Sequence, residues 1–130
     1  MASLYIHIPF CEHKCIYCDF YSVAPNGTAS RSELPTARFV KTLLKELDLR
    51  AKEERFRVSY ETVFLGGGTP SLLPAEDLRL ILERVADSFS IEPGAEITIE
   101  ANPGTVDRQK LEAFRSLGIN RLSIGVQSFH

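Results

Sequence analysis

The N-terminal residues alternate between apolar and more polar side chains. Leu4, Ile6 and Ile8 are apolar, whereas Tyr5 and His7 are more polar. A period of two residues is typical of a β-strand with one buried face, so the pattern predicts a strand over residues 4–8. Three later apolar runs predict further short strands at 62–65, 97–101 and 121–127.

Three amphipathic helices are predicted between these strands. From about Thr36, apolar residues recur at i, i+3, i+4 and i+7, the spacing of a helix with one buried stripe. A second helix is expected to take Pro74 as its first residue. A third is expected from about Val106 to Leu117, with Gly118 as its stop. Strands that alternate with helices indicate parallel βαβ units, so the predicted fold class is α/β.

One face of the predicted strands is polar, whereas a parallel sheet covered on both sides would be apolar on both. In the third strand, Ile97 and Ile99 face one way, and Glu96, Thr98 and Glu100 face the other. This pattern predicts about four βα units of a partial TIM-like barrel with a polar lumen. A full barrel needs roughly 250 residues. Residues 1–130 are therefore predicted to be the N-terminal part of a core domain, with the rest of the barrel and a C-terminal domain absent from this chain.

Barrels of this kind carry their functional sites at the C-terminal ends of the strands. Cys11, Gly66–Thr69, Glu100 and Gln127 lie at or just after predicted strand ends, so we expect them to converge on one rim. The glycine run lacks the Lys-Ser/Thr pair of a phosphate-binding P-loop. It offers backbone groups without β-carbons for ligand binding, although a plain flexible turn is the alternative.

Composition limits the function classes. The chain of 130 residues is 44% hydrophobic and 25% charged, with a formal net charge of −2. These values exclude a disordered chain and disfavour a purely electrostatic nucleic-acid binder. No apolar run approaches the ~18 residues of a transmembrane segment. The first apolar stretch, broken by His7 and Pro9, is too short for a secretory signal, so we predict a cytoplasmic protein without a nucleic-acid partner.

The three cysteines, Cys11, Cys15 and Cys18, have the spacing C-x3-C-x2-C. An odd, clustered set is a poor disulfide framework and is more typical of metal binding in a reducing compartment. Three thiolates can hold three irons of a [4Fe–4S] cluster and leave the fourth iron open for a substrate or cofactor. Zinc bound by the three cysteines with His13 or His7 is the alternative, although the paired C-x2-C spacing of zinc sites is absent.

Four segments of the chain together resemble the radical S-adenosylmethionine (radical SAM) superfamily. Within it, they are similar to the family of oxygen-independent coproporphyrinogen III oxidase, which has a haem-chaperone branch. The segments occur in the expected order and span almost the whole chain: Leu4–Cys18, Gly66–Ser71, Ile99–Pro103 and Asn120–Phe129.

This resemblance implies a set of cofactor contacts. S-adenosylmethionine would chelate the open iron through its amino and carboxylate groups, and one electron from the reduced cluster would yield a 5′-deoxyadenosyl radical. The resemblance places Glu100 at the ribose hydroxyls. It places these further residues near the cofactor: Tyr5, Tyr17, Gly67, Gly68, Thr69 and Gln127.

Simpler interpretations stay open for several of these residues. Glu100 and Gln127 could be ordinary polar residues at strand ends, and Tyr17 could only shield a cluster from water. His7 could be a satisfied lumen residue, and no role is assigned to it. Arg121 is expected to pair with Glu96 or Glu100.

The residues after Cys18 distinguish the two branches. In the oxidases a fourth cysteine typically follows as C-x3-C-x2-C-x-C, whereas here Asp19 and Phe20 follow. The resemblance therefore implies a haem chaperone that passes haem to haem-requiring respiratory proteins, with haem bound beyond residue 130. The alternatives are an oxidase that decarboxylates a porphyrinogen and a zinc-stabilised binding module. The chaperone and oxidase hypotheses both include an electron donor, which the sequence does not identify.

Overall fold

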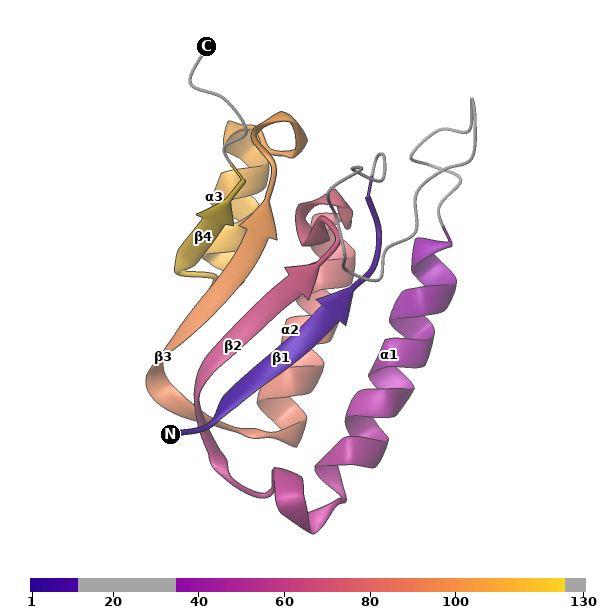
Figure 1. Ribbon diagram of the computed structural model, residues 1–130, viewed down its shortest axis with the longest axis vertical. Coiled ribbons are helices and arrows are strands. Elements are labelled where there is room, and N and C mark those ends of the chain that lie inside the picture. The colour runs from indigo at the N-terminus through magenta and orange to yellow at the C-terminus, as the bar shows by residue number, and fades with distance from the viewer. Residues whose placement is uncertain (12–34, 126–130) are drawn as a thin grey trace.

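The computed structural model describes residues 1–11 and 35–125. There the chain forms a four-stranded sheet in which the strands follow chain order and every neighbouring pair is parallel (Figure 1). The strands are β1 (Ser3–Ile8), β2 (Ser59–Gly67), β3 (Ser90–Ala101) and β4 (Arg121–Ile124). The predicted α/β class with parallel βαβ units is confirmed.

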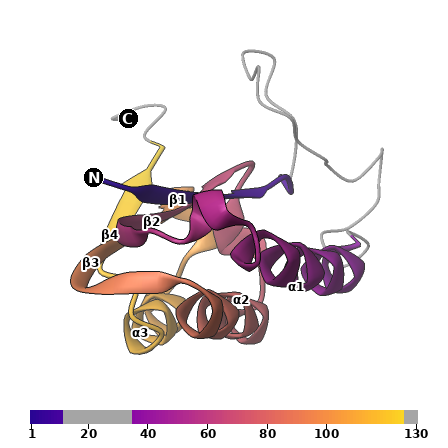
Figure 2. The ribbon, with the colours of Figure 1, turned by 90° about the horizontal axis from the view of Figure 1, so that it is seen from below.

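The helices lie against one side of the sheet (Figure 2). They are α1 (Thr36–Ala51), α2 (Ala75–Ser88) and α3 (Arg108–Ser116). Short 3-10 turns at Glu54–Phe56, Pro70–Leu72 and Pro103–Thr105 each lie between a helix and a strand. In the part of the chain that the structure describes, the other side of the sheet carries no helix. One-sided cover is the arrangement of a barrel wall rather than of a doubly wound sheet. Within the same residues, no helix is long and apolar enough to cross a membrane.

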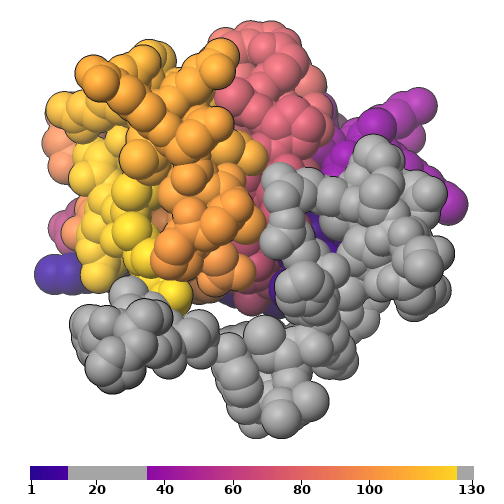
Figure 3. Space-filling view, turned by 90° about the horizontal axis from the view of Figure 1, so that it is seen from above, coloured from indigo at the N-terminus to yellow at the C-terminus, as the bar shows by residue number. Residues whose placement is uncertain are grey.

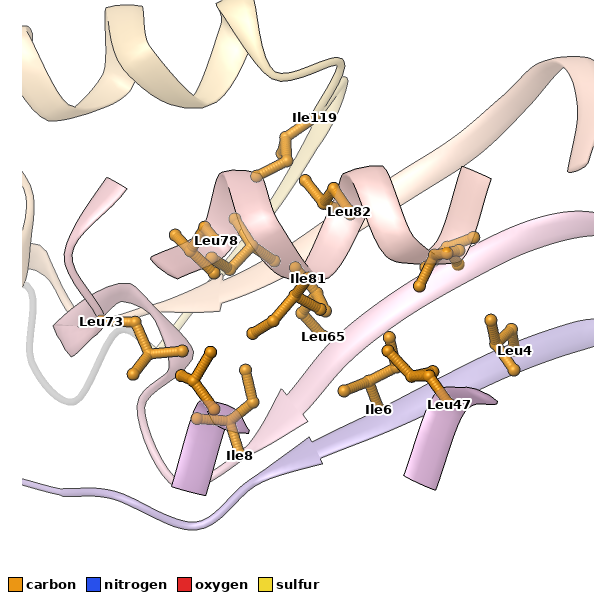
Figure 4. Packing of buried hydrophobic residues seen from close by; sticks show 14 of the residues in the cluster. Leu4, Ile6, Ile8, Leu47, Leu65, Leu73, Leu78, Ile81, Leu82 and Ile119 are labelled. Carbon is orange, nitrogen blue, oxygen red and sulfur yellow. The ribbon is translucent and has the colours of Figure 1, made fainter. Parts of the chain in front are cut away.

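The side chains between sheet and helices form one apolar core (Figure 4). Leu65 and Ile99 are fully buried in it, as is Ile81 of α2. The strand register aligns Ile6, Leu65 and Ile99 in one row across the sheet. Burying a side chain of this size stabilises the fold by about 1.5–3 kcal/mol. The alternation of the sequence thus identifies the buried face correctly.

Local signals place the ends of α3 and the start of α2 within two residues of the observed helix ends. Asp107 caps α3 by accepting a hydrogen bond from the backbone N–H of Lys110 at 2.7 Å, and Gly118 beyond the helix has a φ of +95°. Pro74, predicted as the first helical residue of α2, is instead its N-cap. With ψ at 146°, its backbone is still extended.

β3 begins at Ser90, well before its predicted start at Ile97. Its first half contains Pro93 and Gly94, which favour a turn, and Gly94 has a φ of +79°. β2 pairs with Ser90 and the residue after it and then again from Glu96 onward, so Pro93 and Gly94 lie within the register shift between these two paired stretches. The strand therefore extends past its turn-forming residues by an irregularity of the β-bulge kind, and its early start is set by pairing with β2.

Candidate functional site

The carboxyl ends of the parallel strands lie at one edge of the sheet, the upper edge in Figure 1. The loop after β2 carries Gly68 and Thr69, and Glu100 lies near the end of β3. Seen from this edge, the chain after β2 and the chain after β3 lie side by side (Figure 3). The fold thus brings these predicted contact residues to one rim. Four other predicted site residues lie outside the described residues: Cys15, Tyr17, Cys18 and Gln127.

Gly66 allows a close approach between the side chains of three strands. A Cβ at this position would lie 2.7 Å from Glu100 Oε1 and 3.0 Å from Tyr5 Cε2. It would also lie 2.7 Å from the ring of Phe64. The missing side chain therefore creates the space into which the Glu100 carboxylate reaches.

Gly67 and Gly68 bring the backbone of β2 against the segment that follows β1. Gly67 has a φ of +112°, and a Cβ there would lie 2.8 Å from the His7 ring. A Cβ on Gly68 would lie 2.5 Å from the carbonyl oxygen of Phe10. Each glycine is a steric requirement of this packing, so the loop is more constrained than a plain flexible turn.

Two short backbone hydrogen bonds tie the glycine loop to the start of the cysteine segment. The N–H of Gly68 donates to the carbonyl of Ile8 at 2.7 Å, and the N–H of Thr69 donates to the carbonyl of Phe10 at 2.6 Å. Cys11 follows directly and is buried. The fold therefore holds the first predicted cluster ligand beside the loop that is predicted to contact the cofactor.

Tyr5, His7 and Glu100 form a cluster on the open face of the sheet. The Tyr5 hydroxyl and His7 Nδ1 are hydrogen-bonded at 3.0 Å, and the Tyr5 ring stacks on Phe64 with centroids 6.0 Å apart. Burial raises the pKa of the Glu100 carboxyl, and attraction to His7 opposes this. Burial, and then repulsion from Glu100, raises the pKa of Tyr5. A partly desolvated carboxylate of this kind would gain from hydroxyl donors.

One prediction about a nearby side chain is confirmed. Arg121 pairs with Glu96, with a nitrogen–oxygen distance of 3.4 Å, as one of the two predicted partners. His7, to which the sequence analysis assigns no role, lies between Tyr5 and the glycine loop. Tyr5 and His7 are two positions apart in β1, and this spacing in the sequence places both side chains on one face of the sheet.

A network of hydrogen-bonded side chains lies behind the rim, and no sequence pattern predicts it. Asn102 Nδ2 donates to Thr69 Oγ1 at 3.2 Å, and Ser71 Oγ lies 2.5 Å from Thr105 Oγ1. Thr69, Ser71 and Thr105 are 5%, 0% and 6% exposed. Asn102 stands inside the motif Ile99–Pro103, but nothing in that pattern shows that its side chain meets the loop after β2.

Comparison with known proteins shows the family to which this chain belongs. The model of the radical SAM superfamily matches residues 5–130. Heme chaperone HemW of Haemophilus influenzae is 43% identical over 133 residues, covering 98% of this chain and 33% of that protein. HemW of Escherichia coli is 45% identical over 127 residues, covering 98% and 32%. Oxygen-independent coproporphyrinogen III oxidase of Paracoccus denitrificans is 39% identical, covering 98% and 27%.

The fold agrees with this assignment. The solved structure of coproporphyrinogen III oxidase (HemN) from Escherichia coli, a radical SAM enzyme, superposes with a TM-score of 0.84 at 30% identity. The match covers 98% of this chain and 28% of that one. The chain belongs to the radical SAM superfamily, whose domain implies a [4Fe–4S] cluster and S-adenosylmethionine in general. It spans about a third of the length of the HemW proteins it matches.

Proposed function

We propose, from membership of the radical SAM superfamily, that this chain binds a [4Fe–4S] cluster through Cys11, Cys15 and Cys18. One iron of such a cluster would be open for S-adenosylmethionine, and the cluster would supply one-electron chemistry. We further propose that the protein is a cytoplasmic haem chaperone that delivers haem to haem-requiring respiratory proteins at the membrane. The observation that carries this choice is Phe20, which stands where the oxidase pattern has its fourth cysteine.

The residues of the rim fit an amino-acid cofactor. The N–H groups of Gly68 and Thr69 already donate to the carbonyls of Ile8 and Phe10. Carbonyl oxygens are therefore the groups that the loop can offer, and these suit the ammonium end of S-adenosylmethionine. Side chains at Gly67 and Gly68 would collide with the His7 ring and with the Phe10 carbonyl, so the loop could not keep this conformation.

Glu100 is the proposed ribose contact. Burial partly desolvates its carboxylate and raises its pKa, and ribose hydroxyls would restore hydrogen bonds that water supplies elsewhere. Tyr5 lies close to Glu100, on the same open face. Tyr17 and Gln127 are proposed as further cofactor contacts on the family resemblance alone.

The second candidate function is oxygen-independent coproporphyrinogen III oxidase. The matching solved structure is such an oxidase, and the Paracoccus denitrificans relative has the same name. In that case the substrate would be a porphyrinogen, and the cofactor would supply the radical chemistry for oxidative decarboxylation of its propionate side chains. The oxidase-type cysteine is missing at Phe20, which favours the chaperone.

Metal analysis of the anaerobically reconstituted, full-length protein tests the shared part of both functions. About four irons and four sulfides per chain are expected, with an EPR signal of the reduced cluster that changes when S-adenosylmethionine is added. Cys18→Ala should abolish this signal. Zinc without sulfide, or a signal that S-adenosylmethionine leaves unchanged, would overturn the radical SAM proposal and favour the zinc-stabilised module.

Haem titration and a decarboxylation assay then separate the two functions. We expect haem binding and no decarboxylation of coproporphyrinogen by the wild-type protein. Phe20→Cys, which restores the oxidase pattern, is the matched variant for the assay. Decarboxylation by the wild-type protein in the presence of a reductant would identify an oxidase.

A further inference from the structure

The hydrogens of the network behind the rim can be assigned, because each hydroxyl has only one. Thr105 Oγ1 donates its hydrogen to the carbonyl oxygen of Asn102 at 2.7 Å and accepts from the backbone N–H of Asn102 at 3.2 Å. Ser71 must therefore be the donor in its 2.5 Å contact with Thr105. This part of the network is satisfied without Thr69.

The amide of Asn102 is oriented by neighbours on both sides. It forms a capping box with Thr105, in which the Asn102 side chain accepts from the backbone N–H of Thr105. The amide oxygen is used there, so the amide NH2 faces Thr69 and donates to its Oγ1 at 3.2 Å. Asn102 therefore fills one lone pair of the Thr69 hydroxyl and cannot take its hydrogen.

The Thr69 hydroxyl keeps a hydrogen for which the described part of the chain offers no acceptor. Thr69 is only 5% exposed, and a buried donor without an acceptor is costly. A bound ligand can supply the missing acceptor. An ammonium group carries only donors, whereas a carboxylate oxygen accepts.

We infer that Asn102 is a positioning residue, which holds the Thr69 hydroxyl so that its hydrogen is available to the α-carboxylate of S-adenosylmethionine. This inference rests on the proposed function and deepens it. The loop carbonyls then accept hydrogen bonds from the ammonium group of S-adenosylmethionine, and the Thr69 hydroxyl donates to its carboxylate. Asn102 fixes the orientation of that hydroxyl.

Asn102→Asp is the decisive variant. Aspartate keeps an oxygen for the capping box, since Asn and Asp cap equally well, but it replaces the NH2 by an acceptor that takes the Thr69 hydrogen. In the full-length, reconstituted protein, equilibrium dialysis should show S-adenosylmethionine binding weakened by roughly 10- to 100-fold. Binding of decarboxylated S-adenosylmethionine, which lacks the carboxylate, should change by no more than about twofold relative to the wild-type protein.

Variants of Thr69 provide the controls. Thr69→Val should weaken binding of S-adenosylmethionine by about tenfold or more, whereas Thr69→Ser, which retains the hydroxyl, should stay close to wild type. Equal losses for both ligands in Asn102→Asp would show a merely structural role and overturn the inference. Tighter S-adenosylmethionine binding would also overturn it, since Thr69 would then be an acceptor for the ammonium group.

These outcomes are distinct from a failure of the proposed function. If the wild-type protein assembles its cluster and binds S-adenosylmethionine, only the role of Asn102 is at issue. If the wild-type protein assembles no iron–sulfur cluster and binds neither ligand, both the proposed function and the role of Asn102 are wrong.

Discussion

The two faces of the sheet are built from the same strands but differ in burial and in the kind of side chain they carry. On the helix-covered face, Ile6, Leu65 and Ile99 are at most 3% exposed. On the open face, Tyr5 is 53% exposed and lies beside Glu100. Successive residues of a strand point to opposite faces. One residue therefore packs in the core, and the next lies on the open face that carries the candidate site. The effects of substitutions should therefore alternate along each strand.

The largest expected effect is that of Leu65→Ala. Leu65 is fully buried, and removing its side chain leaves a cavity that should lower the free energy of unfolding by about 2–5 kcal/mol. Phe64→Ala, one residue away on the open face, should lower the free energy of unfolding by less than Leu65→Ala does, because the Phe64 side chain is only partly buried. Urea unfolding of the full-length protein measures both. Equal losses would show that the open face is as tightly packed as the core.

The next largest effect is expected in the glycine loop, at the rim formed by the carboxyl ends of the strands. Gly67→Ala places a side chain at a φ of +112° and 2.8 Å from the His7 ring, so it should cost about 1–3 kcal/mol and weaken S-adenosylmethionine binding. Gly104→Ala is the matched control, because its Cβ meets nothing within 4 Å. Thermal unfolding and dialysis compare the two variants. A neutral Gly67→Ala would mean that the loop is a flexible turn after all.

A smaller effect of opposite sign is expected at Glu100. The folded protein binds the Glu100 proton more tightly than the unfolded chain, because burial raises the pKa of this carboxyl. Its contribution to the free energy of unfolding therefore falls as pH rises from the unfolded pKa of about 4.3 through the raised pKa. Glu100→Gln should stabilise the protein at neutral pH by less than about 1 kcal/mol, and the gain should vanish at low pH.

The measurement for Glu100 is urea unfolding of both proteins without cofactor between acidic and neutral pH. Dialysis of the reconstituted proteins should show weaker S-adenosylmethionine binding by the variant. Stability that drops on substitution at neutral pH would instead show that the ionised carboxylate stabilises the fold.

The smallest effect is expected for the ion pair of Arg121 and Glu96 on the open face. Their side chains are 53% and 50% exposed, and exposed pairs contribute little because water and salt screen them. A double-mutant cycle with Arg121→Ala and Glu96→Ala should give a coupling energy below about 1 kcal/mol that declines with added salt. A larger, salt-independent coupling would show that this part of the open face is shielded from solvent.

Several features of the site follow from the sequence because they depend on local patterns. Alternation along β1 and β3 assigns Ile6 and Ile99 to the buried face and Glu100 to the other. The parallel order of strands brings Glu100 and the glycine loop to one rim. The roles of the site residues as ligands of a cluster and cofactor stay predictions, and Cys15 and Cys18 lie outside the described residues.

Other features depend on contacts between distant parts of the chain. The steric need for Gly66 arises from Glu100 and Tyr5, which lie on other strands. The hydrogen bond between Asn102 and Thr69 joins residues 33 positions apart. No periodicity reports such contacts, since periodicity records only which face a residue occupies and not what lies opposite.

The sequence by itself therefore determined the fold class, the polar and apolar faces of β1 and β3, the family and the candidate ligands, because local periodicity and motif spacing encode these. In β4, Leu122 and Ile124 of the predicted apolar face are 37% and 46% exposed. Only the tertiary structure decided the extent of β3, the N-cap position of Pro74 and the network that fixes the Thr69 hydroxyl. The physical reason is that strand pairing and buried hydrogen bonds are settled by partners brought together on folding, whose identity no single segment contains.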